Sequence, residues 1–233
     1  VDNPFEIKGI NDRVQLSECE HYIQEELKTL WMSKGVSFVD PISCSLSEDS
    51  SFGTDVIIEP QTHLRGKCSI GNGCHLGPGS VITNSTLAEN VLAIHSFINE
   101  ATIGNNTSIG PFAHIRPESN IRQNSKIGNF VEIKKSCIGE GTKINHLSYV
   151  GDSALGKNIN IGAGTITANF DGKNKHRTII DDYSKTGANS VLVAPIKIGA
   201  HVTIGAGSTI SKDIPDKSLV VERSKAIIRT KAD

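Results

Sequence analysis

The stretch IGNNTSIGPFAHIRPESNIRQNSKIGNFVEIKKSCIGEGTKINHLSYVGDSALGKNINIGAGT, residues 103–165, decides the fold. Within it, an aliphatic residue returns at nearly every sixth position, often followed by glycine, and the fourth position after it is mostly small. Helices repeat their apolar positions every three or four residues and half-buried strands every second residue, so neither produces this spacing. The pattern is typical of a parallel β-helix of hexapeptide repeats.

Each hexapeptide supplies a short strand and a turn, and three of them make one coil of about eighteen residues. The aliphatic positions, expected to fill the bore, are Ile103, Ile109, Ile115, Ile121, Ile127, Ile133, Ile138, Ile144, Val150, Leu155 and Ile161. The fourth positions, also expected to face inward, are Thr107, Ala113, Ser119, Ser125, Val131, Cys137, Thr142, Ser148, Ala154, Ile159 and Thr165. An antiparallel meander is the alternative, but it needs hairpin turns and has no fixed six-residue phase. We therefore expect an all-β fold.

Outside this stretch the repeat is less even. The phase is strict from Ile58 to Ile82, is lost over residues 83–102, where we expect irregular coils, and resumes at Leu192. The six-residue period is interrupted over residues 166–180, and this predicts a loop that projects from the side of the solenoid. We expect residues 213–233 to leave the repeat, and about nine coils to fit between residues 50 and 212.

The N-terminal residues do not follow the hexapeptide repeat. Residues 1–13 show no period, whereas residues 14–34 predict an amphipathic helix with Ser17 as N-cap and Gly35 at its end. The apolar face expected for it consists of Ile23, Leu27, Leu30 and Trp31. We interpret this helix as an arm that joins a preceding segment to the solenoid.

Composition restricts the function classes. The 233 residues carry 24 Lys plus Arg against 25 Asp plus Glu, so nothing indicates a nucleic-acid or anionic-membrane partner. No apolar run reaches transmembrane length and no signal peptide opens the chain, which begins with valine and is expected to be a piece of a longer protein. Five cysteines without a C-x-x-C pair favour a reducing cytoplasm over disulfides or zinc. Three of them, Cys68, Cys74 and Cys137, are assigned to inward small positions, while Cys19 and Cys44 stand alone.

Two basic positions interrupt the repeat. Arg116 and Lys134 take places where glycine is usual, eighteen residues apart, so we expect them to lie one above the other. Stacked like charges repel one another unless an anion joins them, which indicates a phosphate-sized partner. The alternative is a solvated basic patch.

His146, in INHLSYVG, also departs from the glycine-led pattern. A neutral imidazole can act as a general base near neutral pH. The other histidines, which can be solvated or structural, are His21, His63, His75, His95, His114, His176 and His201. No close histidine pair or H-x-E motif favours a zinc site.

Five runs carry a family resemblance: IGPFAHIRPES, IGNFVEIKKS, HLSYVGDS, NINIGAGTITANFDGKNKH and GANSVLVAPI. They closely resemble the acetyltransferase domain of the bacterial bifunctional N-acetylglucosamine-1-phosphate uridyltransferase/glucosamine-1-phosphate acetyltransferase family. The opening NPFEIKGINDRVQLSE resembles the end of that family's uridyltransferase domain and its connecting helix. The resemblance therefore covers nearly the whole chain.

This resemblance implies a left-handed β-helix, a handedness that the repeat alone does not give because parallel crossovers are normally right-handed. It implies a cytoplasmic homotrimer with active sites between subunits. The implied reaction moves acetyl from acetyl-CoA to the amine of glucosamine 1-phosphate, giving N-acetylglucosamine 1-phosphate for UDP-N-acetylglucosamine and the cell envelope. It also implies the divisions 1–13, end of the uridyltransferase domain; 14–40, helical linker; 41–222, β-helix; and 223–233, tail.

The resemblance also implies roles for single residues, with His146 as the general base. The positions that match sugar-phosphate contacts are Arg116, Lys134, Tyr149, Asn160 and Lys175. Those that match acetyl-CoA contacts are Ala163, Asn169, Phe170, Ala188, Ala206 and Arg223. Phe170 and Ala188 depart from the tyrosine and serine frequent in the family, and each loses a hydroxyl whose hydrogen bond is worth about 1 kcal/mol.

Asn11 matches an asparagine of the uridyltransferase site that helps to bind magnesium. Without the nucleotide-binding domain it cannot form that site, so we expect this chain to bind no Mg²⁺ and to have no uridyltransferase activity.

Three other functions compete with this one. One is a hexapeptide-repeat acyltransferase that acts on a nucleotide sugar and takes its acyl group from a carrier protein, although such enzymes usually append a helical C-terminal domain. Another is a metal-dependent carbonic anhydrase, which requires three converging histidines. The last is a scaffold without catalysis, which would leave the interruptions at Lys134 and His146 unexplained.

Overall fold

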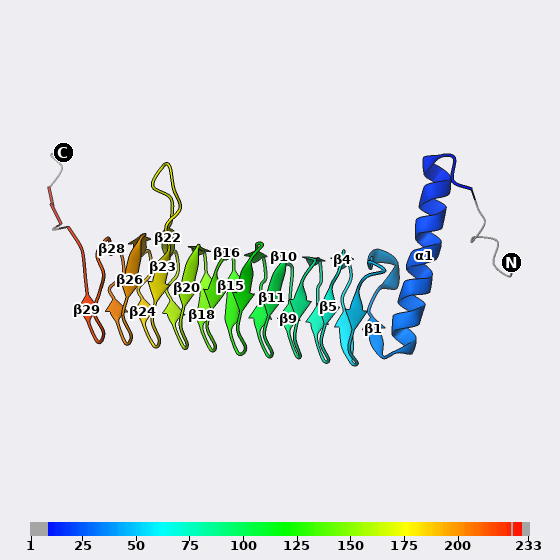
Figure 1. The fold of residues 1–233 in the computed structure, drawn as a ribbon, viewed down its shortest axis with the longest axis horizontal. Helices are drawn as coiled ribbons and strands as arrows, with labels where there is room; N and C mark the ends of the chain where they lie inside the picture. The colour runs from blue at the N-terminus through cyan, green and yellow to red at the C-terminus, as the bar shows by residue number, and fades with distance from the viewer. Residues whose placement is uncertain (1–8, 225, 230–233) are drawn as a thin grey trace.

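The hexapeptide pattern folds into a long three-sided prism of parallel strands with one helix across its end (Figure 1). The computed structural model describes residues 9–224 and 226–229. Residues 1–8 of the expected uridyltransferase segment, and residues 225 and 230–233 of the expected tail, lie outside the described residues. No helix in the described part is long and apolar enough to cross a membrane.

Three sheets form the faces of the prism. Sheet A contains, in spatial order, β1 (Val36–Phe38), β3 (Val56–Ile58), β6 (His75–Leu76), β9 (Leu92–Ala93), β12 (Ser108–Ile109), β15 (Lys126–Asn129), β18 (Lys143–His146), β21 (Asn160–Ile161), β24 (Lys185–Thr186), β27 (Thr203–Ile204) and β29 (Leu219–Val220). Sheet B contains β4 (His63–Arg65), β7 (Val81–Thr83), β10 (Phe97–Asn99), β13 (His114–Ile115), β16 (Glu132–Lys134), β19 (Tyr149–Gly151), β22 (Ile166–Ala168), β25 (Val191–Val193) and β28 (Thr209–Ile210). Sheet C contains β2 (Ser51–Phe52), β5 (Ser69–Ile70), β8 (Thr86–Leu87), β11 (Ala101–Ile103), β14 (Ser119–Ile121), β17 (Cys137–Ile138), β20 (Ser153–Leu155), β23 (Thr178–Ile180) and β26 (Ile196–Ile198). The nine strands of sheets B and C agree with the nine coils expected from the sequence.

The bore is filled by aliphatic side chains stacked in register. In sheet A, for example, Ile109 pairs with Ile127, which pairs with Ile144, and all three are buried. Stacking identical branched side chains from coil to coil gives a continuous apolar core that no single coil could bury alone. The predicted parallel β-helix is confirmed.

The irregular stretch consists of shortened repeats. Steps of five residues join Ile82 to Leu87, Ala93 to Ile98 and Ile98 to Ile103, all of which stay buried. The coils of residues 83–102 therefore lose phase but remain complete.

Similar five-residue steps make two inward assignments wrong. Cys137 and Ala154 lie on the outer side of sheet C, half-buried, and the inward places belong to Ser136 and Ser153. Counting four positions from the preceding aliphatic fails wherever the repeat is one residue short. The five cysteines are free thiols in the structure.

The repeat also runs further than expected. Ile214 forms a bridge with Ile198, and β29 pairs with β27 through Leu219 and Val220. Residues 213–220 thus complete another turn instead of leaving the prism.

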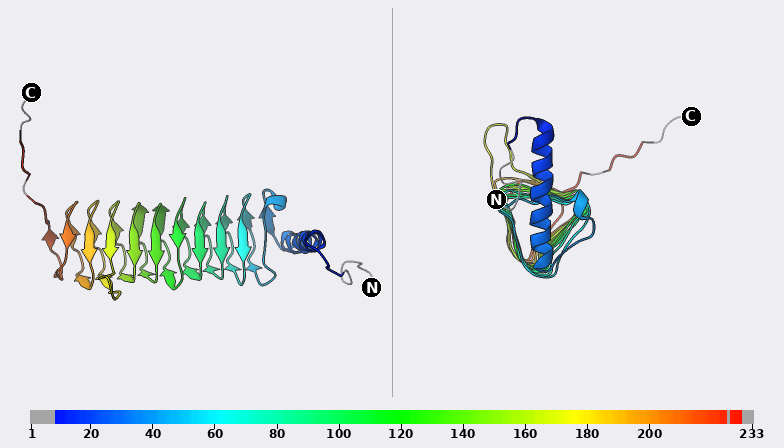
Figure 2. Two further views of the ribbon diagram at one scale, coloured as in Figure 1. Left: turned by 90° about the horizontal axis from the view of Figure 1, so that it is seen from above. Right: turned by 90° about the vertical axis from the view of Figure 1, so that its right-hand side faces the viewer.

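The predicted helix is confirmed as α1, Arg13–Ser33, which lies across the end of the coils (Figure 2, right). Its N-cap is Asp12, whose carboxylate accepts from Gln15 N at 2.8 Å, so the prediction of Ser17 is wrong by more than one turn. Gly35, with φ 95°, ends the helix as expected.

The buried face of α1 differs from the expected one. Leu27 and Trp31 pack on the core, but Ile23 and Leu30 are exposed. Lys28 is buried next to Leu27 and Trp31 on the helix surface, and its ammonium donates to Pro41 O at 2.8 Å in the 3₁₀ helix η2, Pro41–Ser43. The aliphatic part of the Lys28 side chain therefore takes the place of an apolar residue at this end of the prism, while its ammonium is hydrogen-bonded.

Candidate active site

A column of equivalent positions runs along the corner between sheets A and B. It consists of Asn129, His146, Ala163, Ala188 and Ala206. The backbone carbonyl of each accepts a hydrogen bond from the next coil or the tail, at 3.3 Å for His146 and 2.7 Å for Ala163. Beyond His146 the column carries only methyl groups, so it forms a track of little bulk along the edge.

Arg223 marks the far end of this track. After β29 the chain crosses the corner, and the guanidinium Nε donates to Ala206 O at 3.0 Å. The structure therefore places an exposed cation at one end of the alanine column and the imidazole of His146 at the other.

His146 ends β18 and is exposed. Its Nδ1 lies 3.0 Å from Oδ1 of Asn129, the residue paired with it one coil earlier. An amide oxygen accepts, so Nδ1 carries the proton in the neutral ring and Nε2 keeps its lone pair. This tautomer suits a general base that acts through Nε2.

The two basic positions are stacked as predicted. Ile115 pairs with Ile133, and Arg116 N donates to Ile133 O at 2.8 Å, which brings Arg116 over Lys134. Each cation, however, has its own carboxylate: Glu132 lies 2.7 Å from Arg116, and Asp152 lies 3.1 Å from Lys134. The argument that their repulsion requires an external anion is therefore wrong, because the chain supplies counter-charges.

The predicted loop is a hairpin of residues 169–177 that leaves the prism between β22 and β23 (Figure 1). Its bounds are narrower than residues 166–180, because both ends of that range are strands. Phe170 and Lys175 form an antiparallel bridge, and Asp171 accepts from Asn174 N at 2.6 Å and from His176 Nε2 at 2.7 Å. The bonds from Asn174 N and His176, together with one from Lys173 N, hold the pKa of Asp171 far below its usual range. The hairpin is thus braced internally.

Lys175 extends from this hairpin toward the basic wall. Its pKa is lowered because its neutral amine accepts a hydrogen bond from Lys134 and because the positive charge of Lys134 disfavours a second ammonium beside it, and Arg116 acts in the same direction. Asp152 opposes this shift. Three basic side chains, from the turn after β13, from β16 and from the hairpin after β22, therefore gather on sheet B, which is an arrangement suited to a phosphate group.

The remaining predicted residues divide between two faces. Tyr149 lies in sheet B beside Glu132, and Asn169 Nδ2 contacts the Tyr149 hydroxyl at 3.4 Å. Asn160 is exposed on sheet A, between Lys143 and Lys185, so one chain does not bring it to Tyr149. Asn11 precedes α1, at the other end of the prism from the hairpin (Figure 1).

Sequence reasoning missed the partners of the predicted residues. They are Asn129, Glu132, Asp152, Asp171 and His176. Asn129 was detectable, because it lies seventeen residues before His146, which is one coil in this solenoid.

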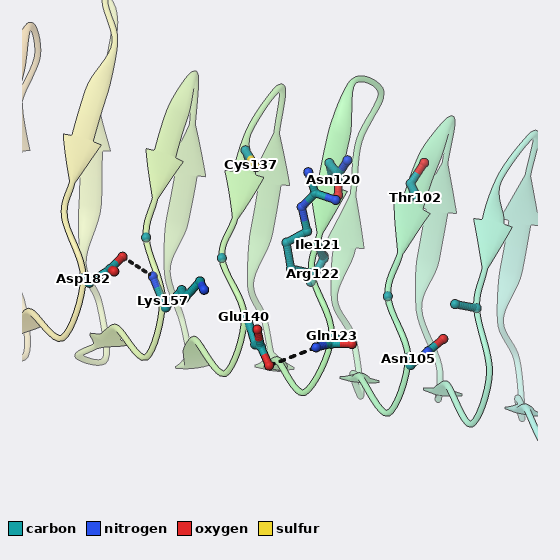
Figure 3. A pocket seen from close by; sticks show the side chains of 14 residues that line it. Thr102, Asn105, Asn120, Ile121, Arg122, Gln123, Cys137, Glu140, Lys157 and Asp182 are labelled. Atoms are coloured by element: carbon teal, nitrogen blue, oxygen red, sulfur yellow. Dashed lines mark hydrogen bonds between the residues drawn. The ribbon is translucent and has the colours of Figure 1, made fainter.

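A separate groove of about 600 Å³ lies on sheet C (Figure 3). Its polar residues bond to one another: Gln123 donates to Glu140 at 2.9 Å, and Lys157 N donates to Asp182 at 2.7 Å. None of the sequence-predicted site residues lines it. The candidate site therefore stays on sheet B and its corner with sheet A.

Within residues 9–224 and 226–229, no three or more His, Cys, Asp or Glu side chains gather as a metal-binding group. The histidine trio of the carbonic anhydrase alternative is thus not found in this part of the chain.

Comparisons with known proteins agree with the hexapeptide-repeat fold. The family model for the GMPPB C-terminal domain matches residues 100–171, and the model for the bacterial transferase hexapeptide (six repeats) matches residues 49–84 and 177–212. The chain is 99% identical over its 233 residues to the bifunctional protein GlmU of Prochlorococcus marinus (strain NATL2A), and 59% identical over 229 residues to that of strain MIT 9313. It spans about half the length of these relatives, 52% and 51%.

Two solved structures share the fold. The UDP-N-acetylglucosamine acyltransferase of Francisella novicida has a TM-score of 0.55 at 20% identity, over 77% of this chain and 65% of that one. The corresponding Arabidopsis acyltransferase has a TM-score of 0.50 at 20% identity, over 81% and 66%. At this identity the likeness concerns the β-helix alone.

Proposed function

This chain belongs to the family of the bifunctional GlmU proteins, and from that premise we propose that it transfers acetyl from acetyl-CoA to the amine of glucosamine 1-phosphate. The product would be N-acetylglucosamine 1-phosphate, an intermediate of UDP-N-acetylglucosamine biosynthesis. The observation that carries this proposal is the position of His146. This residue lies at one end of the alanine track, on the corner between sheets A and B, and the three cations lie on the adjoining sheet B.

The chemistry follows from the tautomer. With Nδ1 bonded to Asn129, the free Nε2 of His146 takes a proton from the amine while the nitrogen attacks the thioester carbonyl. A C–N bond forms, the C–S bond breaks, and the proton ends on the departing CoA thiolate.

We assign the sugar phosphate to the wall of sheet B. Arg116, Lys134 and Lys175 supply the charge for the phosphate, and Tyr149 supplies a hydroxyl. The other sugar contact, Asn160, lies on sheet A and would reach the same substrate from a neighbouring subunit.

Acetyl-CoA, as co-substrate, would lie along the corner. Ala163, Ala188 and Ala206 leave room for its chain, and Arg223 offers a charge to a phosphate. We also assign Asn169 and Phe170 to acetyl-CoA; they lie at the root of the hairpin, at the corner between sheets B and C. Mg²⁺ and Asn11 belong to the uridyltransferase reaction, for which this chain alone would be insufficient.

The assembly proposed is a cytoplasmic homotrimer with sites between subunits and with no nucleic-acid or membrane partner. Its support is a ladder of rings beside His146: the half-buried His95 stacks on the exposed Phe112, which stacks on the exposed Phe130, with centroids 5.4 and 5.5 Å apart. Such a contiguous apolar edge is unusual on a free surface. We keep the divisions 1–13, 14–40, 41–222 and 223–233 as proposed.

The deciding experiment measures release of CoA thiol from acetyl-CoA with glucosamine 1-phosphate. His146→Ala should abolish turnover, whereas His201→Ala, which removes an exposed imidazole from another corner, should not. Turnover by His146→Ala at the normal rate would remove this residue from the mechanism. A folded chain that releases no thiol with this acceptor would refute the function and favour a nucleotide-sugar acceptor.

A further inference from the structure

We propose that Asp152 is a positioning residue that fixes the hairpin of residues 169–177 against Lys134, so that the sugar-phosphate and acetyl-CoA sites assemble around one carboxylate. This inference rests on the proposed acetyltransferase function.

The side chain of Asp152 is held by two donors from different segments. Its Oδ2 accepts from Lys134 Nζ at 3.1 Å and, through a shorter contact, from Asn169 Nδ2. The side chains of Asp152 and Lys134 are 13% and 16% exposed, and Asn169 is buried. A carboxylate with so little exposed surface needs hydrogen-bond donors from the protein, and Lys134 and Asn169 supply them, so the three side chains are held together.

The backbone of Asp152 adds two further contacts. Its amide donates to Lys134 O at 3.0 Å, and its carbonyl accepts from Thr178 N at 3.4 Å. Asn169 begins the hairpin and Thr178 follows it, so this one residue contacts both roots of the projecting segment. Its φ of 48° lies in the left-handed region, which aspartate adopts more readily than most residues.

Through Asn169 the network reaches both proposed ligands. Asn169 is assigned to acetyl-CoA, and its amide also contacts the hydroxyl of Tyr149, assigned to the sugar. Lys134 and Lys175 are assigned to the phosphate. Asp152 touches neither ligand in this arrangement; it sets the distance between the groups that do.

The charge of Asp152 also acts on Lys175. The groups that face this ammonium are Lys134 and Arg116, which disfavour its charge, and Asp152, which favours it. Removing the carboxylate should therefore lower the pKa of Lys175 further and weaken phosphate binding at alkaline pH. A purely structural residue would not produce this pH effect.

The test compares Asp152→Asn with Asp152→Ala in the thiol-release assay, varying each substrate. The Asn side chain can still accept from Asn169 but presents no charge to Lys134. We expect its KM for glucosamine 1-phosphate to rise about tenfold, with the KM for acetyl-CoA within about twofold. The Ala variant should raise both values about tenfold, with a smaller change in kcat. In the Asn variant, the alkaline loss of sugar-phosphate binding should begin at lower pH.

Asp181→Asn is the control, because Asp181 forms an ion pair with Lys197 on sheet C, 3.4 Å apart, outside the site. Unchanged KM values in Asp152→Asn, with the pH profile of the wild type, would overturn the proposal even if the melting temperature fell. If the Ala variant fails to fold, the Asn variant decides alone. A wild-type chain without turnover would instead refute the proposed function, which separates the two failures.

Discussion

The imidazole of His146 and the amide of Asn129 form a pair whose purpose can be tested without touching the base itself. Asn129→Ala removes the acceptor at Nδ1, so the ring loses both its tautomer preference and its orientation. We expect kcat to fall about tenfold, equivalent to about 1.4 kcal/mol, with little change in either KM.

Steady-state kinetics of Asn129→Ala beside Asn120→Ala checks this. Asn120 lies on sheet C, away from the column, and its variant should behave as the wild type. A fall in acetyl-CoA binding in place of kcat would show that Asn129 serves the coenzyme.

Lys175 gives a prediction about how the KM for glucosamine 1-phosphate changes with pH. Its pKa lies below the usual 10.5 because of the hydrogen bond with Lys134 and that residue's charge, opposed by Asp152. The ammonium is therefore lost at lower pH than in an ordinary lysine, and the KM for glucosamine 1-phosphate should rise as pH increases toward that range. Lys175→Arg stays charged throughout and should remove this rise. An identical alkaline rise in both proteins would exclude Lys175 as its origin.

Among the elements, the hairpin of residues 169–177 depends on Asp171. Because the folded pKa of this carboxyl is depressed, its bonds are fully present above the unfolded pKa, about 3.9, and are lost only as pH falls through the lower folded value. At neutral pH the brace is intact.

Asp171→Ala removes the hydrogen bonds that brace the hairpin, so Lys175 should be held less firmly. We expect the KM for the sugar phosphate to rise about fivefold, which corresponds to about 1 kcal/mol of binding free energy. The melting temperature should hardly change, since the hairpin lies outside the prism, and amide exchange over residues 169–177 should accelerate. Lys173→Ala, in the same hairpin, is the control. Unchanged exchange in Asp171→Ala would contradict the bracing role.

The elements also show what the sequence could predict. The six-residue phase predicted the prism because an inward aliphatic must recur wherever the bore is stacked. It misplaced Cys137 and Ala154 because a five-residue repeat shifts every count made from the preceding aliphatic. It also missed the final turn, where Ile214 and Val220 are inward but no longer follow the hexapeptide spacing.

The charged residues of the candidate site could be predicted from the sequence, but the residues to which they bond could not. Arg116, Lys134 and His146 stand out because they interrupt a repeat that needs no polar groups. Their partners Glu132 and Asp152 do not interrupt it: one occupies an ordinary outward position and the other a corner. Which outward residue bonds to which depends on the register between coils, and that register requires the exact length of every repeat.

At the scale of the whole molecule, stability should depend on the continuity of the stacked core. Ile127 is fully buried between Ile109 and Ile144, so Ile127→Ala leaves a cavity that the flanking coils cannot close. We expect a loss of about 2–5 kcal/mol in the free energy of unfolding, measured with denaturant. Ile57→Ala, on the outer side of sheet A and 38% exposed, should cost less than about 1 kcal/mol. Equal losses would contradict the stacked core.

Assembly determines whether Asn160, on sheet A, can serve the same substrate as Tyr149, on sheet B. Within one chain the two lie on different faces, and the ring ladder of His95, Phe112 and Phe130 occupies the corner between them. If copies pack along that ladder, a second sheet A faces the first sheet B and the site is closed. Phe130→Asp places a charge at the end of the ladder and should convert the proposed trimers into monomers without thiol release.

Sedimentation at matched concentration checks this, with circular dichroism to show that the coils persist. Ile42→Asp is the control, because Ile42 is 85% exposed on η2, beside α1 at the other end of the prism. It should sediment as the wild type. A Phe130→Asp variant that remains trimeric would show that the copies meet elsewhere. A monomer that keeps full activity would show instead that Asn160 is not needed by the neighbouring site.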